Sequence, residues 1–160
     1  MSSEEEMEKA AKVFFASSKF AVAGASSDPR KFGNKIFAWY LAHGITPTPL
    51  NPTTSSVDVR NKSFETKASP SALSDPKNTS LSVITPPSVT SKLLKEAKEV
   101  GIRSVWLQPG SFDSEVLALA KKEFPGAAVG GDGGGGSEGW CILVDGEWAM
   151  KEAGRKEGRL

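Results

Sequence analysis

Short apolar runs alternate along the chain with longer segments in which apolar residues recur every three to four positions. Such runs are typical of strands in a sheet that is covered on both faces. A less regular strand is also expected where two prolines interrupt an apolar stretch. The pattern predicts strands at residues 20–25, 46–50, 81–85, 104–107 and 127–129.

The segments between these strands predict helices with one apolar face. They are expected at residues 34–42, at 88–100 with Ser88 as the cap, and from Ser111 or Asp113 to Phe124. Strands that alternate with helices form successive βαβ units. The sequence therefore predicts an α/β fold with one doubly wound, mostly parallel sheet and helices on both faces.

Two polar or glycine-rich segments interrupt this alternation. The first is rich in Ser, Thr and Pro, and we expect a short edge strand at 62–67 and a helical turn at 70–73. The second, 130–139, is dominated by glycine and is interpreted as a mobile linker rather than a phosphate nest. An edge strand at 140–144 and a turn at Asp145-Gly146 are expected to follow.

The length of 160 residues is enough for one domain with its own core. We expect a domain at 19–150, a charged tail at 151–160, and a helix within 1–18 that packs on the domain. This helix has Ser3 as its expected cap, an acidic first turn and apolar residues at helical spacing.

Charge and cysteine content narrow the cellular setting. The net charge is +1, which argues against binding to nucleic acid or to a membrane surface. Cys141 is the only cysteine, so no internal disulfide can form and a reducing compartment is favoured. The acidic start of the sequence is unlike a signal peptide, and no apolar stretch approaches the roughly 20 residues of a membrane span. A cytoplasmic protein is expected.

The junction between the first strand and the following helix has the features of a phosphate site. The strand ends at Gly24, Gly33 opens the helix, and Arg30 and Lys31 lie in the loop between them. Backbone N–H groups and the dipole of a helix N-terminus attract phosphate. We therefore expect a phosphorylated ligand at this loop.

The loop does not match the common nucleotide motifs. Ser26 and Pro29 stand where a dinucleotide fingerprint would have glycines, and the sequence of a P-loop is absent. Asn51-Pro52 follows the second strand, where an NAD-binding domain usually carries Asp or Glu, and Asp58 comes too late. Ordinary use of NAD is therefore disfavoured.

Four loops are expected to meet at one rim of the sheet, because each follows the carboxyl end of a strand. They are residues 24–33, 51–54, 85–88 and 108–111. Ligands of open α/β sheets bind at this rim.

Four short motifs follow one another along the chain: Val22-Ala23-Gly24-Ala25-Ser26, Asn51-Pro52, Val83-Ile84-Thr85-Pro86-Pro87 and Val105-Trp106-Leu107-Gln108-Pro109-Gly110. In these motifs the chain resembles the stand-alone CoA-binding-domain family, which is Rossmann-like and related to the CoA-binding part of succinyl-CoA synthetase α subunits and ADP-forming acyl-CoA synthetases. The likeness spans roughly residues 19–130.

The resemblance implies a CoA site along the rim. The glycine loop would present its N–H groups to the pyrophosphate, the nearby cations would meet the pyrophosphate or 3′-phosphate, and Asn51-Pro52 would border the adenosine. The segment 85–88 would line the pantetheine side, and Gln108 would face the same cleft. The candidate cofactor-binding residues are Gly24, Ala25, Ser26, Ser27, Arg30, Lys31, Gly33, Asn34, Lys35, Asn51, Pro52, Thr85, Pro86, Pro87, Ser88 and Gln108.

Candidates for catalysis are few. His43 is the only histidine and is expected to be a structural residue at the end of a helix. Cys141 lies between Trp140 and Ile142, which favours a buried structural thiol over the cysteine that members of the family carry after the last strand. We expect no catalytic residues and no metal site.

These observations favour a non-catalytic protein that binds CoA or acyl-CoA as a sensor, carrier or regulatory module. Two alternatives stay open. One is an atypical NAD(P)-dependent oxidoreductase, because Arg30 and Lys31 suit a 2′-phosphate. The other is an interaction subunit with a vestigial nucleotide cleft. The expected partner is a small nucleotide ligand, and a protein partner or a homo-oligomer is compatible with the sequence.

Overall fold

A five-stranded parallel sheet forms the centre of the computed structural model, which describes residues 2–155. The strand order is β2-β1-β5-β6-β7, and an antiparallel hairpin, β3-β4, lies apart from the sheet. The sheet strands are β1 (Lys19–Ala23), β2 (Thr48–Leu50), β5 (Thr79–Val83), β6 (Ser104–Leu107) and β7 (Ala128–Val129), and the hairpin is β3 (Ser56–Val59) and β4 (Lys62–Glu65).

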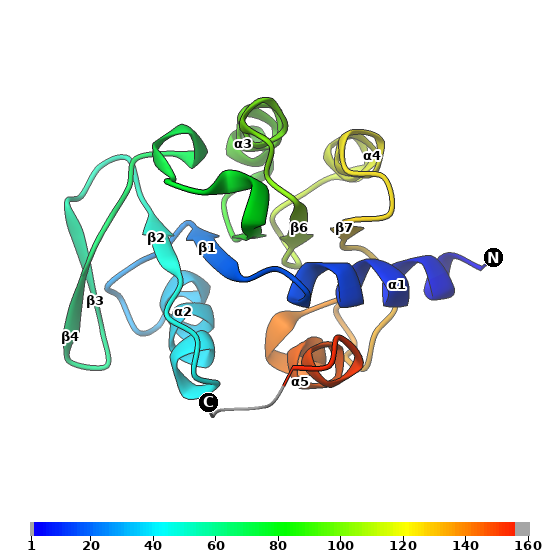
Figure 1. Ribbon diagram of the computed structural model, residues 1–160, viewed down its shortest axis with the longest axis horizontal. Helices are drawn as coiled ribbons and strands as arrows, with labels where there is room; N and C mark the ends of the chain where they lie inside the picture. The colour runs from blue at the N-terminus through cyan, green and yellow to red at the C-terminus, as the bar shows by residue number, and fades with distance from the viewer. Residues whose placement is uncertain (1, 156–160) are drawn as a thin grey trace.

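Helices cover both faces of the sheet, as Figure 1 shows. The helices α3 and α4 lie on one face, and α1, α2 and α5 lie on the other. This arrangement confirms the predicted α/β, Rossmann-like fold. The helices are α1 (Ser3–Phe15), α2 (Phe32–Ala42), α3 (Pro87–Val100), α4 (Ser114–Glu123) and α5 (Ile142–Glu152), with short 3-10 turns at Pro70–Ala72 and Pro76–Asn78.

The sheet separates two hydrophobic cores, and alternate residues of β1 pack into one or the other. Phe20 and Val22 of β1 point to the core beneath α1, α2 and α5, whereas Ala21 and Ala23 point to the core beneath α3 and α4. Side chains of successive strand residues lie on opposite faces, so a strand that is apolar throughout needs cover on both.

An aromatic cluster joins α1 to the sheet. The rings of Phe14 and Phe15 lie 5.5 and 5.9 Å from that of Trp106 on β6, and both also contact Phe20. Ser2, rather than the expected Ser3, caps α1 through a capping box with Glu5. Burial of this many aromatic rings fixes α1 against β6, β7 and α5.

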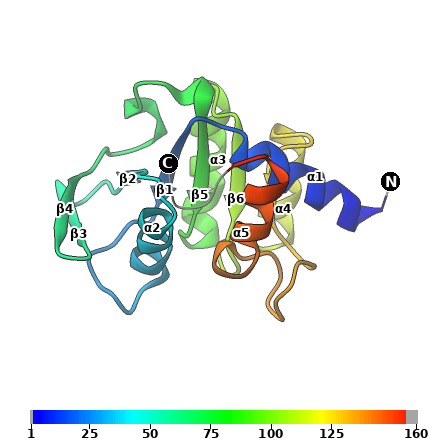
Figure 2. The ribbon, with the colours of Figure 1, turned by 60° about the horizontal axis from the view of Figure 1, so that its bottom comes forward.

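Strand order places the switch point of the sheet between β1 and β5. From β1 the chain crosses to β2 on one side, and from β5 it continues to β6 and β7 on the other. The loops that follow β1 and β5 therefore diverge and leave a crevice at their carboxyl ends. In Figure 2 the loop after β1 (blue) and the glycine-rich segment before α5 (orange) extend toward the same end of the molecule.

Residues 142–152 form α5, so the expected edge strand at 140–144 and turn at Asp145-Gly146 are wrong. The Asp145 carboxylate accepts hydrogen bonds from the Cys141 and Gly135 N–H groups, at 3.0 and 2.7 Å. Position 146, inside the helix, requires glycine because the Trp39 ring occupies the space into which a Cβ would project. Tertiary packing thus overrides the strong β-propensity of the local sequence.

The glycine-rich segment, expected to be a mobile linker, is attached to the domain by hydrogen bonds. Trp140 donates its backbone N–H to the Gly131 carbonyl at 2.9 Å, and the Gly135 N–H reaches Asp145. After α5, Arg155 donates to the Phe15 and Ser17 carbonyls. The expected charged tail thus begins inside the last turn of α5, and residues 156–160 lie outside the described part of the chain.

Smaller differences from the sequence analysis concern element ends. Pro86, not Ser88, is the N-cap of α3, and Asp113 is the cap of α4, with its side chain accepting from the Val116 N–H at 2.8 Å. The expected strand at 62–67 pairs with β3, which the sequence analysis missed.

Replacement of Gly146 by Ala tests the packing of α5. In an open helix Gly→Ala stabilises by about 1 kcal/mol. Here the new methyl group overlaps the Trp39 ring, and we expect the free energy of unfolding to fall by about 2 kcal/mol in urea titrations. In a Trp39→Ala background the same change should be neutral or stabilising. An equal loss in both backgrounds would contradict the packing of Gly146 on Trp39.

Candidate cofactor site at the carboxyl rim

A close backbone contact shapes the loop after β1. Gly24 has a φ of 93°, and its N–H donates to the Leu50 carbonyl of β2 at 3.3 Å. Gly33, in the first turn of α2, lies so near the Gly24 carbonyl that an added Cβ would overlap its oxygen. The start of α2 therefore lies directly against the end of β1, which requires glycine at position 33.

Two asparagine side chains hold this loop in place. Asn34 is buried, and its Nδ2 donates to the carbonyls of Ser26 at 3.0 Å and Asp58 at 3.3 Å. The Nδ2 of Asn51, at the end of β2, donates to the Ala25 carbonyl at 3.1 Å. Aspartate offers no such donor at neutral pH. The asparagine at this strand end thus positions the loop backbone.

The β3-β4 hairpin is attached to the same loop. The Ser27 hydroxyl accepts a hydrogen bond from the Asp58 N–H at 2.8 Å, and Asn34 reaches the Asp58 carbonyl. A cavity of about 550 Å³ lies here, between the loop and the hairpin. It is lined by Ser27, Pro29, Asn34, Asp58, Arg60, Asn61, Lys62 and Ser63.

Arg60 and Lys62 are cations at the rim that the sequence analysis missed. Arg60 and Asn61 form the turn of the hairpin with positive φ values of 54° and 65°. The alternation of Val57, Asp58 and Val59 before an Asn-containing turn was the available signal for this hairpin.

The first turn of α2 carries positive charge and no cap. No side chain caps this helix, and no acidic residue lies in its first turn, unlike α1 with its capping box and three glutamates. Lys31 is exposed at the N-cap, and the Lys35 ammonium lies 5.2 Å from the centroid of the Phe32 ring. Uncapped N–H groups and the helix dipole favour an anion at this position.

Arg30 is partly neutralised within the loop. Its guanidinium contacts both Asp28 carboxylate oxygens at 3.0 Å. Hydrogen bonds from the Arg30 side chain and backbone hold the pKa of the Asp28 carboxyl below its usual range. The cations that stay available to a ligand at this helix start are therefore Lys31 and Lys35.

The segment after β5 is held by threonine hydroxyls. The Thr85 and Thr90 hydroxyl oxygens are 2.8 Å apart, and Thr90 also donates to the Thr85 carbonyl. Pro86 and Pro87 begin α3, and Ser88 is exposed in its first turn. An added Cβ on Gly24 would contact Ile84 and Thr85 at 3.4 Å, so this segment lies beside the glycine loop.

Gln108, at the end of β6, is buried and connects the sheet to α5. Its Oε1 accepts from the Ile142 N–H at 2.8 Å, and its Nε2 donates to the Cys141 Sγ at 3.2 Å. The Cys141 thiol is half-exposed, so the expectation of a buried thiol is wrong. Gln108 and Cys141 line a second cavity of about 310 Å³, together with Phe32, Pro109, Gly136, Ser137, Glu138, Gly139 and Val144.

The structure thus brings the predicted residues together along one edge. The Gly24 loop is central, Asn51-Pro52 and the hairpin cavity lie on the β2 side, and Thr85–Ser88 and Gln108 lie on the β5 and β6 side.

Residues 18–139 match the family model described as a CoA binding domain. The chain belongs to the CoA-binding domain family.

Several solved structures have the same fold. A conserved hypothetical protein from Pyrococcus furiosus is 31% identical, with a TM-score of 0.57 over 66% of this chain and 86% of that one. A hypothetical protein from Pyrococcus horikoshii shares the fold at 21% identity, with a TM-score of 0.70 over 89% and 91% of the two chains. A Thermus thermophilus structure is 25% identical, with a TM-score of 0.61 over 81% and 90%. Among curated proteins, none matches this CoA-binding domain.

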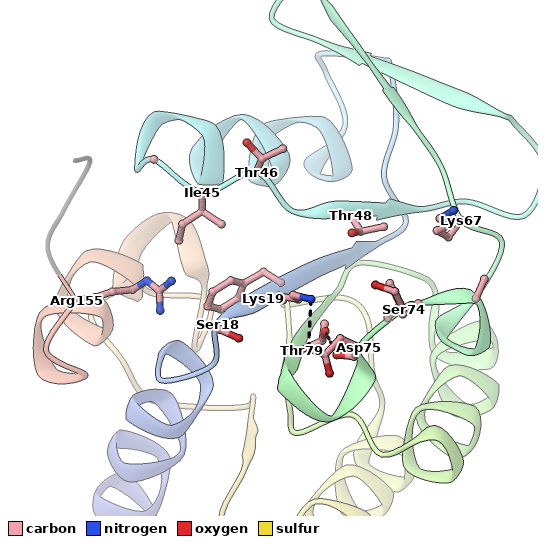
Figure 3. A pocket seen from close by; sticks show the side chains of 14 residues that line it. Ser18, Lys19, Ile45, Thr46, Thr48, Lys67, Ser74, Asp75, Thr79 and Arg155 are labelled. Carbon is pink, nitrogen blue, oxygen red and sulfur yellow. Dashed lines mark hydrogen bonds and ion pairs between the residues drawn. The ribbon is translucent and has the colours of Figure 1, made fainter. Parts of the chain in front are cut away.

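Another cavity of this CoA-binding domain, about 570 Å³, lies at the opposite, amino edge of the sheet (Figure 3). Lys19 and Thr79, the first residues of β1 and β5, line it. Two of the cations beside this cavity already have partners in the protein. Lys19 forms an ion pair with Asp75 at 3.2 Å, and the Arg155 guanidinium donates hydrogen bonds to the Phe15 and Ser17 carbonyls. Ligands of parallel α/β sheets bind at the carboxyl edge. We therefore place the candidate site at the carboxyl edge, although the cavity at the amino edge has a similar volume.

His43 is remote from the rim, at the C-terminal end of α2. Its ring stacks on Trp39 with centroids 4.1 Å apart, and its Nε2 lies 2.9 Å from Glu147 of α5. The histidine connects α2 to α5, in keeping with a structural residue at a helix end.

None of the described helices is long and apolar enough to cross a bilayer.

Replacement of Gly33 by Ala tests the backbone contact at the loop. The new Cβ overlaps the Gly24 carbonyl oxygen, and we expect the free energy of unfolding to fall by about 3 kcal/mol in denaturant titrations. Gly135→Ala is the matched control, because its Cβ would meet only ordinary contacts at 3.4 Å. Equal stabilities of the two variants would refute the close approach of α2 to β1.

Proposed function

We propose that this protein binds CoA or acyl-CoA reversibly along the carboxyl rim and has no chemistry of its own. The observation that carries the proposal is the uncapped, lysine-bearing start of α2 against the glycine loop, in a chain of the CoA-binding domain family. The site would take the pyrophosphate there. Its use would be that of a sensor, a carrier or a regulatory module in the cytoplasm.

The cavities on either side of the loop suggest which end of the CoA molecule lies on which side. The polar cavity at the hairpin, with Arg60 and Lys62, suits the adenosine and its 3′-phosphate. From the pyrophosphate, the pantetheine arm would pass Thr85–Ser88 toward Gln108. Asn51-Pro52 would border the adenosine on the β2 side.

The rim side chains support binding rather than proton transfer. Asn34 and Asn51 donate to loop carbonyls, Thr85 is paired with Thr90, and Gln108 with α5. His43, the only histidine of the sequence, lies at the far end of α2. These fixed amides and hydroxyls orient a ligand and do not themselves act as general bases near neutral pH.

Calorimetric titration of CoA, 3′-dephospho-CoA and NADPH tests the proposal. We expect CoA to bind most tightly and loss of the 3′-phosphate to weaken binding by about tenfold, since charge-assisted hydrogen bonds contribute about 1.5–3 kcal/mol. Lys62→Ala, in the cavity proposed for the 3′-phosphate, should remove most of the difference between CoA and 3′-dephospho-CoA. Lys122→Ala is the charge-matched control, because Lys122 is exposed in the last turn of α4.

Two outcomes would contradict the proposal. Preference for NADPH would favour the oxidoreductase alternative. Absence of binding by all three ligands would favour an interaction subunit that has the fold without the cofactor.

A further inference from the structure

Two exposed apolar side chains lie on one cavity at the rim. Phe32 at the start of α2 and Val144 in the first turn of α5 are each 53% exposed, the highest exposures among the large hydrophobic residues described as exposed. Both line the 310 Å³ cavity next to Gln108 and Cys141. Large apolar side chains that gather around a hollow on the surface mark a binding site.

The glycine-rich segment forms one wall of this cavity without filling it. A Cβ added on Gly136 would meet the Val144 side chain at 3.4 Å, and one added on Gly139 would crowd the Gly131 carbonyl oxygen at 2.5 Å. Gly139 also has a φ of 94°. The Gly139 contact therefore folds the segment back on Gly131, and the glycines beside Val144 add no side chains to the cavity, so the exposed faces of Val144 and Phe32 stay open to a ligand.

The cavity lies where the end of the pantetheine arm would arrive. Phe32 follows Lys31 at the expected pyrophosphate position, and Gln108 ends β6, which is two strands from β1. Two strand spacings are about 10 Å, a distance that the extended arm spans. The thiol end of CoA would therefore reach Gln108 and Cys141.

We propose that this cavity, the acyl pocket, receives the acyl group of a short-chain acyl-CoA, with the chain between Phe32 and Val144. The inference rests on the proposed function and names the ligand class within it. A dry cavity of about 150 Å³ holds benzene. The acyl pocket, at about 310 Å³, has room for a chain of similar carbon number and the end of the pantetheine arm.

Titration of acetyl-CoA, butyryl-CoA and CoA tests the acyl pocket. Two further buried methylene groups should make butyryl-CoA bind about tenfold more tightly than acetyl-CoA. Val144→Ser and Phe32→Ser should each reduce this ratio to about threefold or less. Leu143→Ser is the matched control, since Leu143 is its exposed neighbour on α5 and does not line the pocket.

Alkylation of Cys141 reports on occupancy of the pocket itself, because the chain has no other cysteine. The rate of reaction with N-ethylmaleimide is followed by intact-protein mass. We expect saturating butyryl-CoA, which has no free thiol, to slow the reaction at least tenfold. Adenosine 3′,5′-bisphosphate, which lacks the pantetheine arm, should leave the rate unchanged.

The outcomes separate the two proposals. If CoA binds but butyryl-CoA shows no advantage over acetyl-CoA, or leaves the Cys141 rate unchanged, the acyl pocket is refuted and the CoA site stands. If neither CoA nor its thioesters bind, the proposed function fails, and this inference fails with it.

Discussion

The contact of the Gly33 backbone with the Gly24 carbonyl is the constraint on which the rest of the rim depends. It fixes α2 directly at the end of β1, so that its uncapped first turn faces the crevice. The Asn34 and Asn51 amides then determine the course of the loop by donating to its carbonyls. No side chain caps the first turn of this helix, and an uncapped helix N-terminus favours an anion.

The helix α5 extends the site beyond the glycine loop. It packs on α2 through Gly146 and Trp39, and Gln108 of the sheet contacts its first residues. Asp145 joins this helix start to the glycine-rich segment. As a result the apolar residues of α5 and α2 border a single pocket at the end of the rim where the proposed ligand carries its thiol.

The sequence analysis predicted the central sheet because its signals are local. Apolar strands, amphipathic helices and the loop motifs at their carboxyl ends all follow from short-range periodicity. The motifs at Gly24, Asn51, Thr85 and Gln108 therefore mapped to one edge, and the family match of residues 18–139 agrees with them.

The C-terminal part and the hairpin could not be predicted in the same way. The segment from Trp140 to Val144 is rich in residues that favour strands, and its helix depends on the Asp145 carboxylate and on packing against Trp39, which are distant contacts. The half-exposure of Cys141 follows from that helix. Arg60 and Lys62 join the site only because Asp58 hydrogen-bonds to Ser27 and Asn34.

We infer that the ligand binds at the carboxyl rim and not in the cavity at the amino edge. Backbone amide NMR spectra recorded during a CoA titration test it most directly, because both edges are observed in one experiment. Binding at the rim should cause large shifts at Gly24, Ser26, Gly33 and Gln108, with little change at Lys19, Ile45 and Asp75. Shifts concentrated at the amino edge, with the Gly24 loop unchanged, would contradict it.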